Sequence, residues 1–496
     1  MLPAQAAPPG PVVARAPRRL AVAVVGAGLS GLAAAWRLAQ LGHRVTVLER
    51  QAAPGFVAHS VGVPAPGLRA GSVAGGRAAA AAVRVDVPIR VFYAGYYPSL
   101  VRLYAELGVA TEAVSYASSF QGADGALYFR YRNWLIGGAS YSWVAPLDLL
   151  SPRARRIVAG ALRFRREALA ALASGALAGR TIGEFIAGGR GRQGGQDEAF
   201  VRGLLLPAVA TICTCSYEDA LNFPAAVIVE YLARGLTREP VRRAVLGADE
   251  VARRLCEGIV QQGGEVCLSQ GLAGLRREGS DGAEGPEGAV VLRLQGGALA
   301  RFDHVVLATQ ANQARALLED ASAAEHRMLA GFSYRPIEVV MHRDASLMPS
   351  RRRDWSAVNL LVTPEGAQPQ STIWVNAVQP ALRAMAAGSS GGEAPILQTV
   401  HPLRAPRAEA VISTARFERP VVDAASERAL AGLATLHAEP GRRVWFCGSY
   451  AQPGIPLLES AVGSAETAVR ALSAAHGAGH RGRLGAAPGV ERSQAA

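Results

Sequence analysis

The chain has 496 residues, half of them hydrophobic, and a formal net charge of +13; this length allows two or three domains with a large core. Its basic side chains are all arginines, because no lysine occurs, and this excludes any mechanism that requires a lysine amine. The arginines are scattered and form no basic stripe with interleaved aromatic residues, so we expect no nucleic-acid partner. The five cysteines fit neither a disulfide framework nor a zinc-ligand pattern, so we expect no metal site.

The composition of the two ends of the chain predicts that both lie outside the folded domains. Residues 1–19 are rich in proline, alanine and arginine and contain no acidic residue, which is typical of a disordered or transit-like leader. Residues 476–496 predict a disordered tail. Arg18 and Arg19 precede an apolar stretch and mimic a secretion signal, but cleavage there would destroy the glycine motif that follows. We therefore expect an intracellular protein, either cytoplasmic or in an organelle that the sequence does not identify.

An apolar strand, a glycine-rich turn, a helix and a second strand follow one another in residues 20–50. The turn carries Gly26, Gly28 and Gly31 in the pattern G-x-G-x-x-G, and the second strand ends on Glu49. In such a unit the first glycine permits a tight turn, the second lets backbone approach a pyrophosphate, and the third lets helix and strand pack closely. The helix N-terminus offers free amides to phosphates, and Glu49 can accept hydrogen bonds from a ribose diol. The residues predicted to contact a dinucleotide here are Gly26, Ala27, Gly28, Leu29, Ser30, Gly31, Glu49 and Arg50.

The middle of the chain predicts helices over 100–107 and 153–176. In the second helix apolar residues share one face while arginines lie elsewhere. Such a basic amphipathic helix can rest on a membrane surface. The alternative, which we favour, is a surface helix whose apolar stripe faces its own core, so a peripheral membrane contact stays open. Cys213 and Cys215 would face one side of an extended strand, either as a redox pair or, as we favour, as small buried hydrophobes.

Residues 249–308 alternate again between helix and strand. The predicted elements are a helix over 249–262 and strands over 265–268, 272–276, 289–294 and 302–308. This succession is similar to the second half of a dinucleotide fold, in which a strand near Leu272 passes the adenine. The apolar strand that ends at Ala308 and Thr309 closes on small residues, as is needed where backbone approaches a nucleotide.

A further strand, 443–448, ends at Gly448 and leads to a helix that begins near Glu459, with the small residues Ser460 and Ala461 after it. This helix N-terminus returns from the far end of the chain and can bring amides to a ribityl chain or a flavin carbonyl. A plain NAD dehydrogenase has no use for this arrangement, so the pattern favours FAD. Cys447 lies on the strand rather than over the flavin edge, and we expect the FAD to be bound non-covalently.

The opening β-α-β unit, the VVLAT strand and the FCGSY and LLESAVGSAETA segments resemble the FAD-dependent amine oxidase and phytoene desaturase superfamily. Within it the chain is most similar to the branch usually called predicted NAD/FAD-binding or amine oxidase-like proteins. Further matching stretches are residues 85–109, 211–225, 342–362 and 443–450. The resemblance implies an α/β fold, with a discontinuous Rossmann-like FAD-binding domain of the glutathione reductase type and an inserted α+β substrate domain.

The resemblance also predicts a division into two domains, each made of separate segments of the chain. The FAD-binding domain comprises 20–84, 241–321 and 441–475, and the substrate or cap domain comprises 85–240 and 322–440. The resemblance assigns Leu272 to an adenine contact through its backbone. It also places Gly448 and residues 459–461 near the pyrophosphate, ribityl chain or flavin.

The chain departs from the family pattern in three places. A Gly-Gly-Arg or Gly-Gly-His turn beside the flavin is replaced by residues 54–59, PGFVAH, and His59 or the loop after it can substitute. Ser460 stands where many relatives have glycine. The lysine that holds a water at flavin N5 in many amine oxidases is absent, which weighs against amine oxidation more than against flavin binding.

We therefore expect an FAD-dependent oxidoreductase, an oxidase, dehydrogenase or desaturase, that takes a hydride from a small organic substrate, with a lipid or isoprenoid favoured. The electron acceptor is oxygen or another molecule that the sequence does not identify. A flavin amine oxidase is the first alternative. A non-catalytic nucleotide-binding protein on the same fold and an NAD-dependent dehydrogenase are the others. No residue stands out as catalytic: Asp86, Tyr93, Tyr96 and Tyr97 lie in the segment that approaches the flavin in relatives. A tyrosine there could orient a substrate or shield the ring, but we expect the tyrosines to pack.

Overall fold

The computed structural model describes residues 19–57, 59–64, 82–188, 195–235, 239–278, 289–363, 369–387 and 395–476. The predicted leader and tail, apart from Arg19 and His476, lie outside these residues. So does most of the loop after His59. Among the described residues no helix combines the length and the apolar character needed to cross a membrane.

A five-stranded parallel sheet gathers segments from both ends of the chain. Its strands, in spatial order, are β10 (Glu265–Cys267), β2 (Arg44–Leu48), β1 (Ala21–Val25), β14 (His304–Leu307) and β20 (Val444–Phe446). The central strands are nearly continuous apolar runs, because helices or a second sheet cover both faces. The chain passes from β1 to β2 on one side and later adds β14 on the other side. The switch point therefore lies between β1 and β14, where ligands bind in open sheets of this kind.

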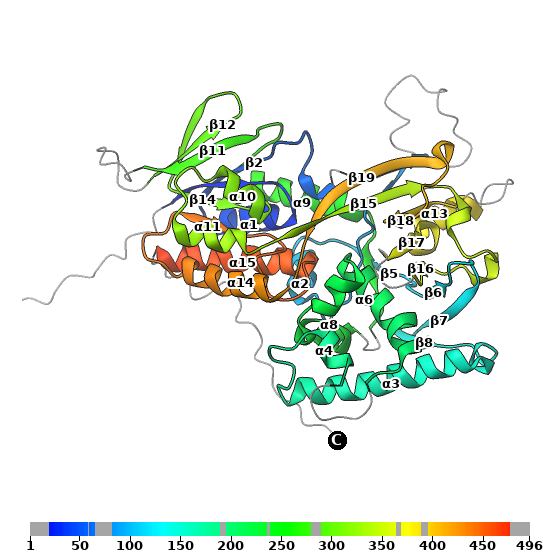
Figure 1. Ribbon diagram of the computed structural model, residues 1–496. Coiled ribbons are helices and arrows are strands. Elements are labelled where there is room, and N and C mark those ends of the chain that lie inside the picture. The colour runs from blue at the N-terminus through cyan, green and yellow to red at the C-terminus, as the bar shows by residue number, and fades with distance from the viewer. Residues whose placement is uncertain are drawn as a thin grey trace, which may run out of the picture.

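Two hydrophobic cores cover the faces of this sheet (Figure 1). One core contains α1 (Leu29–Gln40), α2 (Pro98–Glu106), α9 (Gly247–Gln261) and α15 (Leu458–Ala475). The other contains α10 (Ala311–Leu317), α11 (Ala323–Ala330), α14 (Ala424–His437) and a small antiparallel sheet. That sheet consists of β11 (Leu272–Arg277), β12 (Val290–Leu294) and β13 (Leu299–Phe302). The predicted strand over 302–308 is thus two strands, because the chain turns at Asp303 between β13 and β14.

A second, eight-stranded sheet lies beside the parallel one (Figure 1). Its strands, in spatial order, are β19 (Val411–Pro420), β15 (Tyr334–His342), β18 (Leu397–Val400), β17 (Gln370–Trp374), β16 (Val358–Leu361), β6 (Ser118–Gln121), β7 (Leu127–Ile136) and β8 (Ala139–Trp143). All neighbours are antiparallel except β16 and β6. Short elements at its border are β3 (Val61–Pro64), β4 (Ala82–Val85), β5 (Thr111–Ala113), β9 (Arg242–Ala244), α12 (Val375–Val378) and α13 (Pro380–Ala387).

A helical subdomain with its own core completes the second half of the molecule. Its helices are α3 (Pro152–Ala173), α4 (Ile182–Ile186), α6 (Leu206–Cys213), α7 (Tyr217–Asn222) and α8 (Ala225–Gly235). The predicted extended strand around Cys213 is wrong: Cys213 ends α6, and Thr214 follows with a φ of 53°. The short apolar run of this segment reads equally well as a buried helix, and tertiary packing decided between the two.

Candidate functional site

The glycine turn has the geometry that its sequence pattern predicts. Gly26 has a φ of 101°, and its amide donates to the carbonyl of Leu48 at 2.8 Å. A Cβ on Gly31 would lie 1.9 Å from the carbonyl oxygen of Gly26, so helix α1 reaches β1 only because residue 31 has no side chain. A Cβ on Gly28 would meet nothing within 4 Å. The backbone at Gly28 therefore faces open space at the N-terminus of α1, where a phosphate can approach it.

Helix α1 leaves its positive end uncompensated. Gly28 occupies the N-cap position without a side-chain cap, and the first turn contains no acidic residue. Leu29 and Ser30, the first residues of the helix, are buried. Since the first amides of a helix have no partner within it, this end is suited to an anion.

Glu49 lies beside this turn, at the end of β2, and its carboxylate is buried. Its Oε2 accepts a hydrogen bond from the amide of Ala27 at 2.7 Å, and its Oε1 accepts one from the amide of Gln51 at 2.9 Å. An ionised carboxylate has further lone pairs, so both oxygens can still accept hydroxyl groups of a ribose. Arg50, the next residue, is exposed.

Backbone hydrogen bonds bring the strand that contains Leu272 close to Glu49. The amide of Glu49 donates to the carbonyl of Cys267 at 2.9 Å, and the amide of Gln270 donates to the carbonyl of Glu49 at 2.7 Å. Leu272 begins β11 two residues later and is buried. The predicted adenine contact thus belongs to the same edge of the sheet as the predicted ribose contact.

Three segments that are far apart in the sequence meet at the glycine turn. A Cβ on Gly26 would lie 3.1 Å from the carbonyl oxygen of Ala308, and one on Gly448 would lie 3.4 Å from that of Thr309. The amide of Gly448 donates to Ser464 Oγ of α15 at 3.0 Å. The carboxyl ends of β1, β14 and β20 therefore form one edge, and the end of the chain returns to its beginning there.

The first turn of α15 contacts the first turn of α2 through the side chain of Glu459. Both oxygens of Glu459 accept hydrogen bonds at 3.0 Å, from the amides of Ser99 and Leu100 in the first turn of α2. Burial raises the pKa of this carboxyl group, against the lowering effect of these amides. Ser460 Oγ donates to the carbonyl of Ile455 at 2.7 Å, and Ala461 is buried. The side chain of Glu459 therefore caps α2, and the predicted cofactor contact of residues 459–461 stays a prediction.

The turn that replaces the expected Gly-Gly-Arg brings a different cation to the site. Phe56 is buried, and its amide donates to the carbonyl of Ala27 at 3.4 Å. Arg90 Nη2 donates to the carbonyl of Phe56 at 2.8 Å, and the guanidinium lies 4.2 Å from the centroid of the Phe56 ring. His59, the predicted substitute, is exposed and its ring lies 6.2 Å from that of Phe417. Sequence reasoning missed Arg90, because nothing in its own segment marks it as a neighbour of the glycine turn.

A second arginine, Arg419, resembles Arg90: both side chains are half-buried, and the Nε atom of each is buried without a hydrogen-bond partner. Among the described residues neither guanidinium forms an ion pair with a carboxylate within 4 Å. Burial lowers the pKa of both groups; the Asp86 carboxylate offsets this in part for Arg90, and the Cys213 thiol and Tyr97 phenol do so for Arg419. By contrast, the buried Arg442 pairs with Glu325 at 2.7 Å. Buried cations without partners cost free energy, and such groups are typical of sites for anions.

The predicted packing of the tyrosines is confirmed. The rings of Tyr93, Tyr96 and Tyr97 contact one another, and those of Tyr93 and Tyr96 also contact Tyr231, mostly edge to face, with centroids 4.8–6.3 Å apart. The hydroxyl of Tyr93 donates to the carbonyl of Tyr231 at 3.1 Å, and burial raises the pKa of Tyr96 to about 12. These phenols are therefore protonated at neutral pH, and their rings belong to the core that α1, α2, α9 and α15 share.

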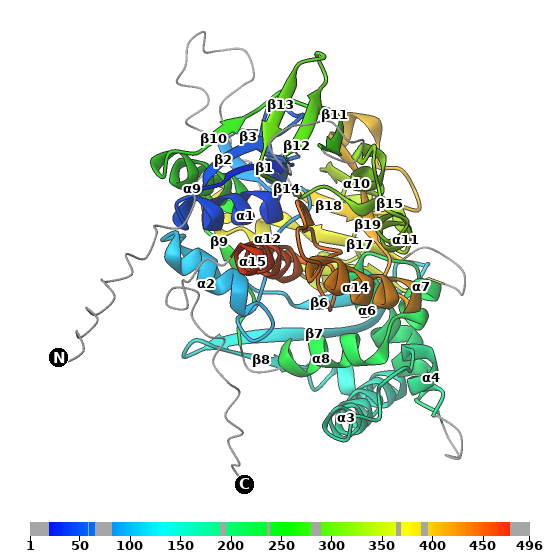
Figure 2. The ribbon, with the colours of Figure 1, turned by 90° about the vertical axis from the view of Figure 1, so that its left-hand side faces the viewer.

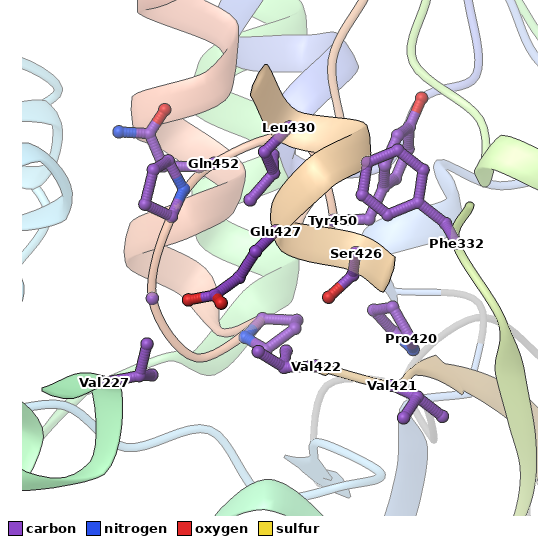
Figure 3. Close-up of a pocket in the computed structure, with 13 residues that line it drawn as sticks. Val227, Phe332, Pro420, Val421, Val422, Ser426, Glu427, Leu430, Tyr450 and Gln452 are labelled. Carbon is purple, nitrogen blue, oxygen red and sulfur yellow. The ribbon is translucent and has the colours of Figure 1, made fainter. Parts of the chain in front are cut away.

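A small cavity of about 50 Å³ lies beside the return loop (Figure 3). Its lining includes Pro420, Ser426 and Glu427, together with Tyr450 and Gln452 of the return loop. This volume holds a few water molecules rather than an organic substrate.

The residues at the sheet edge fit the ADP half of a flavin dinucleotide. Gly28 leaves the space that a pyrophosphate needs, Glu49 offers acceptors to a ribose, and the orphaned Nε of Arg90 points to a missing anionic or polar partner near the turn.

Comparison with known proteins agrees with this geometry. A family model described as an NAD(P)-binding Rossmann-like domain matches residues 24–107, and no curated protein matches the chain. Cyclohexylamine oxidase from Brevibacterium oxydans IH-35A superposes with a TM-score of 0.57 at 15% identity, over 92% of this chain and 99% of that one. A fatty acid isomerase from P. acnes, named as producing CLA, superposes with a TM-score of 0.59 at 15% identity, over 91% and 98%.

The chain has the fold of the FAD-dependent amine oxidases. A redesigned putrescine oxidase shares this amine oxidase fold, with a TM-score of 0.57 at 15% identity over 92% of this chain and 99% of that one. The predicted α/β class is confirmed, and the two sheets of the chain correspond to the two-domain architecture of these enzymes. At this level of identity the likeness establishes the fold, and it leaves the substrate open.

Proposed function

We propose that the protein is an FAD-dependent oxidoreductase that takes a hydride from an organic substrate. The observation that carries this proposal is the meeting of Gly26, Ala308 and Gly448 at one sheet edge, with open space above Gly28. A nucleotide-binding turn alone would serve NAD equally well. The return of β20 and α15 to this turn supports FAD, because a second helix N-terminus at the edge can face a ribityl chain or a flavin carbonyl.

FAD, when bound, supplies the hydride acceptor at flavin N5, so the protein need only hold, orient and shield the reactants. The Gly28 backbone and the N-terminus of α1 would hold the pyrophosphate, Glu49 the ribose, and Leu272 the adenine. Arg90 would lie close to the same turn. The tyrosine cluster would exclude water from the core beside α2 and α8, because its rings are closely packed and the hydroxyls of Tyr93 and Tyr96 are hydrogen-bonded.

For the substrate we propose an organic molecule of lipid or isoprenoid type rather than an amine. Two solved neighbours are an amine oxidase and a fatty acid isomerase by name, so the fold does not decide between these classes. The charges of two arginines do favour the lipid class. The guanidiniums of Arg90 and Arg419, whose Nε atoms have no hydrogen-bond partner, would disfavour a protonated amine beside them and favour a carboxylate such as that of a fatty acid. The absence of lysine weighs in the same direction.

The visible spectrum of the purified protein tests the cofactor. We expect a yellow protein that releases FAD on heating, and a colourless protein that binds NADH instead would contradict the proposal. Anaerobic mixing with fatty acids, polyenes and amines then tests the substrate class. Loss of the flavin absorbance with a lipid would support our choice, whereas loss with an amine alone would overturn it and leave the cofactor assignment intact.

A further inference from the structure

Large exposed hydrophobic side chains are concentrated in one part of this molecule. Among the described residues sixteen such side chains are exposed, and nine of them lie between residues 134 and 172. They are Trp134, Leu135, Ile136, Tyr141, Leu147, Leu150, Leu162, Leu169 and Leu172. The exposed fractions reach 80% for Leu147, 70% for Leu150 and 64% for Leu162. Single exposed hydrophobics need no explanation, but this many within 39 consecutive residues indicate an interaction surface.

Helix α3 shows how this surface is built. Its inner face, which includes Ile157 and Phe164, is buried against the helical subdomain and the β6–β7 strands, as its sequence pattern predicts. Its outer face carries Leu162 and Leu169, which are seven residues apart and hence share one side of the helix. The outward leucines are a second apolar stripe that burial in the protein's own core does not explain.

Arginines flank these leucines. Helix α3 contains six arginines and one glutamate, Glu167. Arg165 and Arg166 are exposed, and neither has an ion pair among the residues that the structure describes. Arg155 instead donates to the carbonyls of Leu149 and Leu150, and so ties the preceding turn to the helix. The outer surface is therefore both apolar and strongly cationic.

The hairpin of β7 and β8 lies on the same side of the molecule as α3. In both ribbon views these elements run along the lower side, away from α1 and β2 (Figures 1 and 2). The hairpin carries Trp134, Ile136 and Tyr141, and the turn at 148–150 joins it to α3. We call the exposed residues of 134–172 the lower surface.

We propose that the lower surface binds the headgroup layer of an anionic membrane. Leucines and an isoleucine would enter the boundary between headgroups and acyl chains, tryptophan and tyrosine would lie at that boundary, and the arginines would contact lipid phosphates. A second copy of the chain is a poorer occupant, because a symmetric interface would set the arginines of one α3 against those of the other. The inference goes beyond the oxidoreductase proposal and holds whether or not the protein binds FAD.

Sedimentation of the full chain with lipid vesicles tests this inference. We expect binding to vesicles of two parts phosphatidylcholine and one part phosphatidylglycerol, little binding to phosphatidylcholine alone, and release at about 0.5 M salt, where charges are screened. Arg165→Gln with Arg166→Gln should weaken the partition coefficient on the order of ten- to thirtyfold, since each arginine near an anionic surface adds roughly three- to fivefold. Leu162→Ser with Leu169→Ser should also weaken it, while leaving the salt dependence that the arginines produce.

Two matched controls carry the same changes elsewhere on the surface. Arg276→Gln with Arg315→Gln removes two exposed arginines, and Leu299→Ser with Leu403→Ser removes two exposed leucines. Both controls should bind vesicles like the wild type. Equal loss in controls and test variants, or no binding of the wild type to anionic vesicles at low salt, would overturn the proposal. Dimerisation that is abolished by the Leu162 and Leu169 changes, without vesicle binding, would overturn it in favour of a contact between copies.

Discussion

Two glycines of one turn differ in what a side chain would meet. A Cβ on Gly31 would lie 1.9 Å from the carbonyl oxygen of Gly26, whereas one on Gly28 would meet open space at an ordinary φ of −69°. Gly31→Ala should lower the free energy of unfolding by about 1–3 kcal/mol, because the backbone must move. Gly28→Ala should keep it within about 0.5 kcal/mol but reduce the flavin released per mole of protein. Urea unfolding measures the stability of each variant, and the spectrum of the heated supernatant measures its flavin content. Full flavin content in the Gly28 variant would contradict the predicted phosphate contact at Gly28.

Arg419 permits a test of whether its guanidinium stabilises the fold or costs stability. Arg419 is half-buried and its Nε is buried without a hydrogen-bond partner, so an apolar residue of similar volume relieves part of a desolvation cost. Arg419→Met should therefore raise the free energy of unfolding by about 1 kcal/mol. Arg442, which pairs with Glu325 and Glu439, is the control, and Arg442→Met should lower it by about 3–5 kcal/mol. Equal destabilisation of the two variants in urea would show that the fold requires the Arg419 guanidinium.

At the scale of elements, α15 connects the cofactor edge to α2. The Glu459 carboxylate caps α2 through the amides of Ser99 and Leu100, so the C-terminal helix orders a segment 360 positions earlier in the chain. Glu459→Ala should cost about 1–2 kcal/mol of stability, as for other lost helix caps, and should speed hydrogen exchange at the start of α2. Glu257→Ala removes an exposed carboxylate and should change stability by less than about 0.5 kcal/mol. Unchanged exchange at residues 99 and 100 would refute the capping role.

For the whole molecule, two buried histidines predict sensitivity to acid. Burial lowers the pKa of His304 to about 3, aided by His476 and Arg443, and burial lowers the pKa of His342 to about 4. Because both folded pKa values lie below the unfolded value, their contribution to stability is present above pH 6.5 and is lost as the pH falls toward 4. We expect each to cost about 2 kcal/mol at pH 5 relative to pH 7.5.

Unfolding in urea at these two pH values measures that loss. His342→Gln keeps a polar side chain that does not titrate, so its stability should change less between pH 7.5 and pH 5 than that of the wild type. His326 is exposed and serves as the control, since His326→Gln should leave the pH dependence unchanged. A wild-type stability that is flat over this range would contradict the prediction.

Much of the fold was predictable because its signals are local. The glycine spacing, the acid at the end of β2 and the small residues after β14 each lie within a few positions of one another, and each reports a backbone requirement that any nucleotide fold must meet. The face of α3 that packs inward was predictable for the same reason, since a helical period places those residues on one side. The apolar run at Cys213 was not, because a short buried segment has the same composition as a strand or as a helix.

The sequence by itself determined that a β-α-β turn for a dinucleotide opens the chain and that no lysine chemistry is available. Only the tertiary structure decided that Glu459 caps α2, that Arg90 lies beside the glycine turn, and that the Nε of Arg419 is buried without a hydrogen-bond partner. These facts depend on residues that are 34 to 360 positions apart where a contact is formed, and the charges that surround a side chain are set by which strands pair and which helices pack. A local pattern carries no information about such partners, so the polar contacts of the site had to come from the folded molecule.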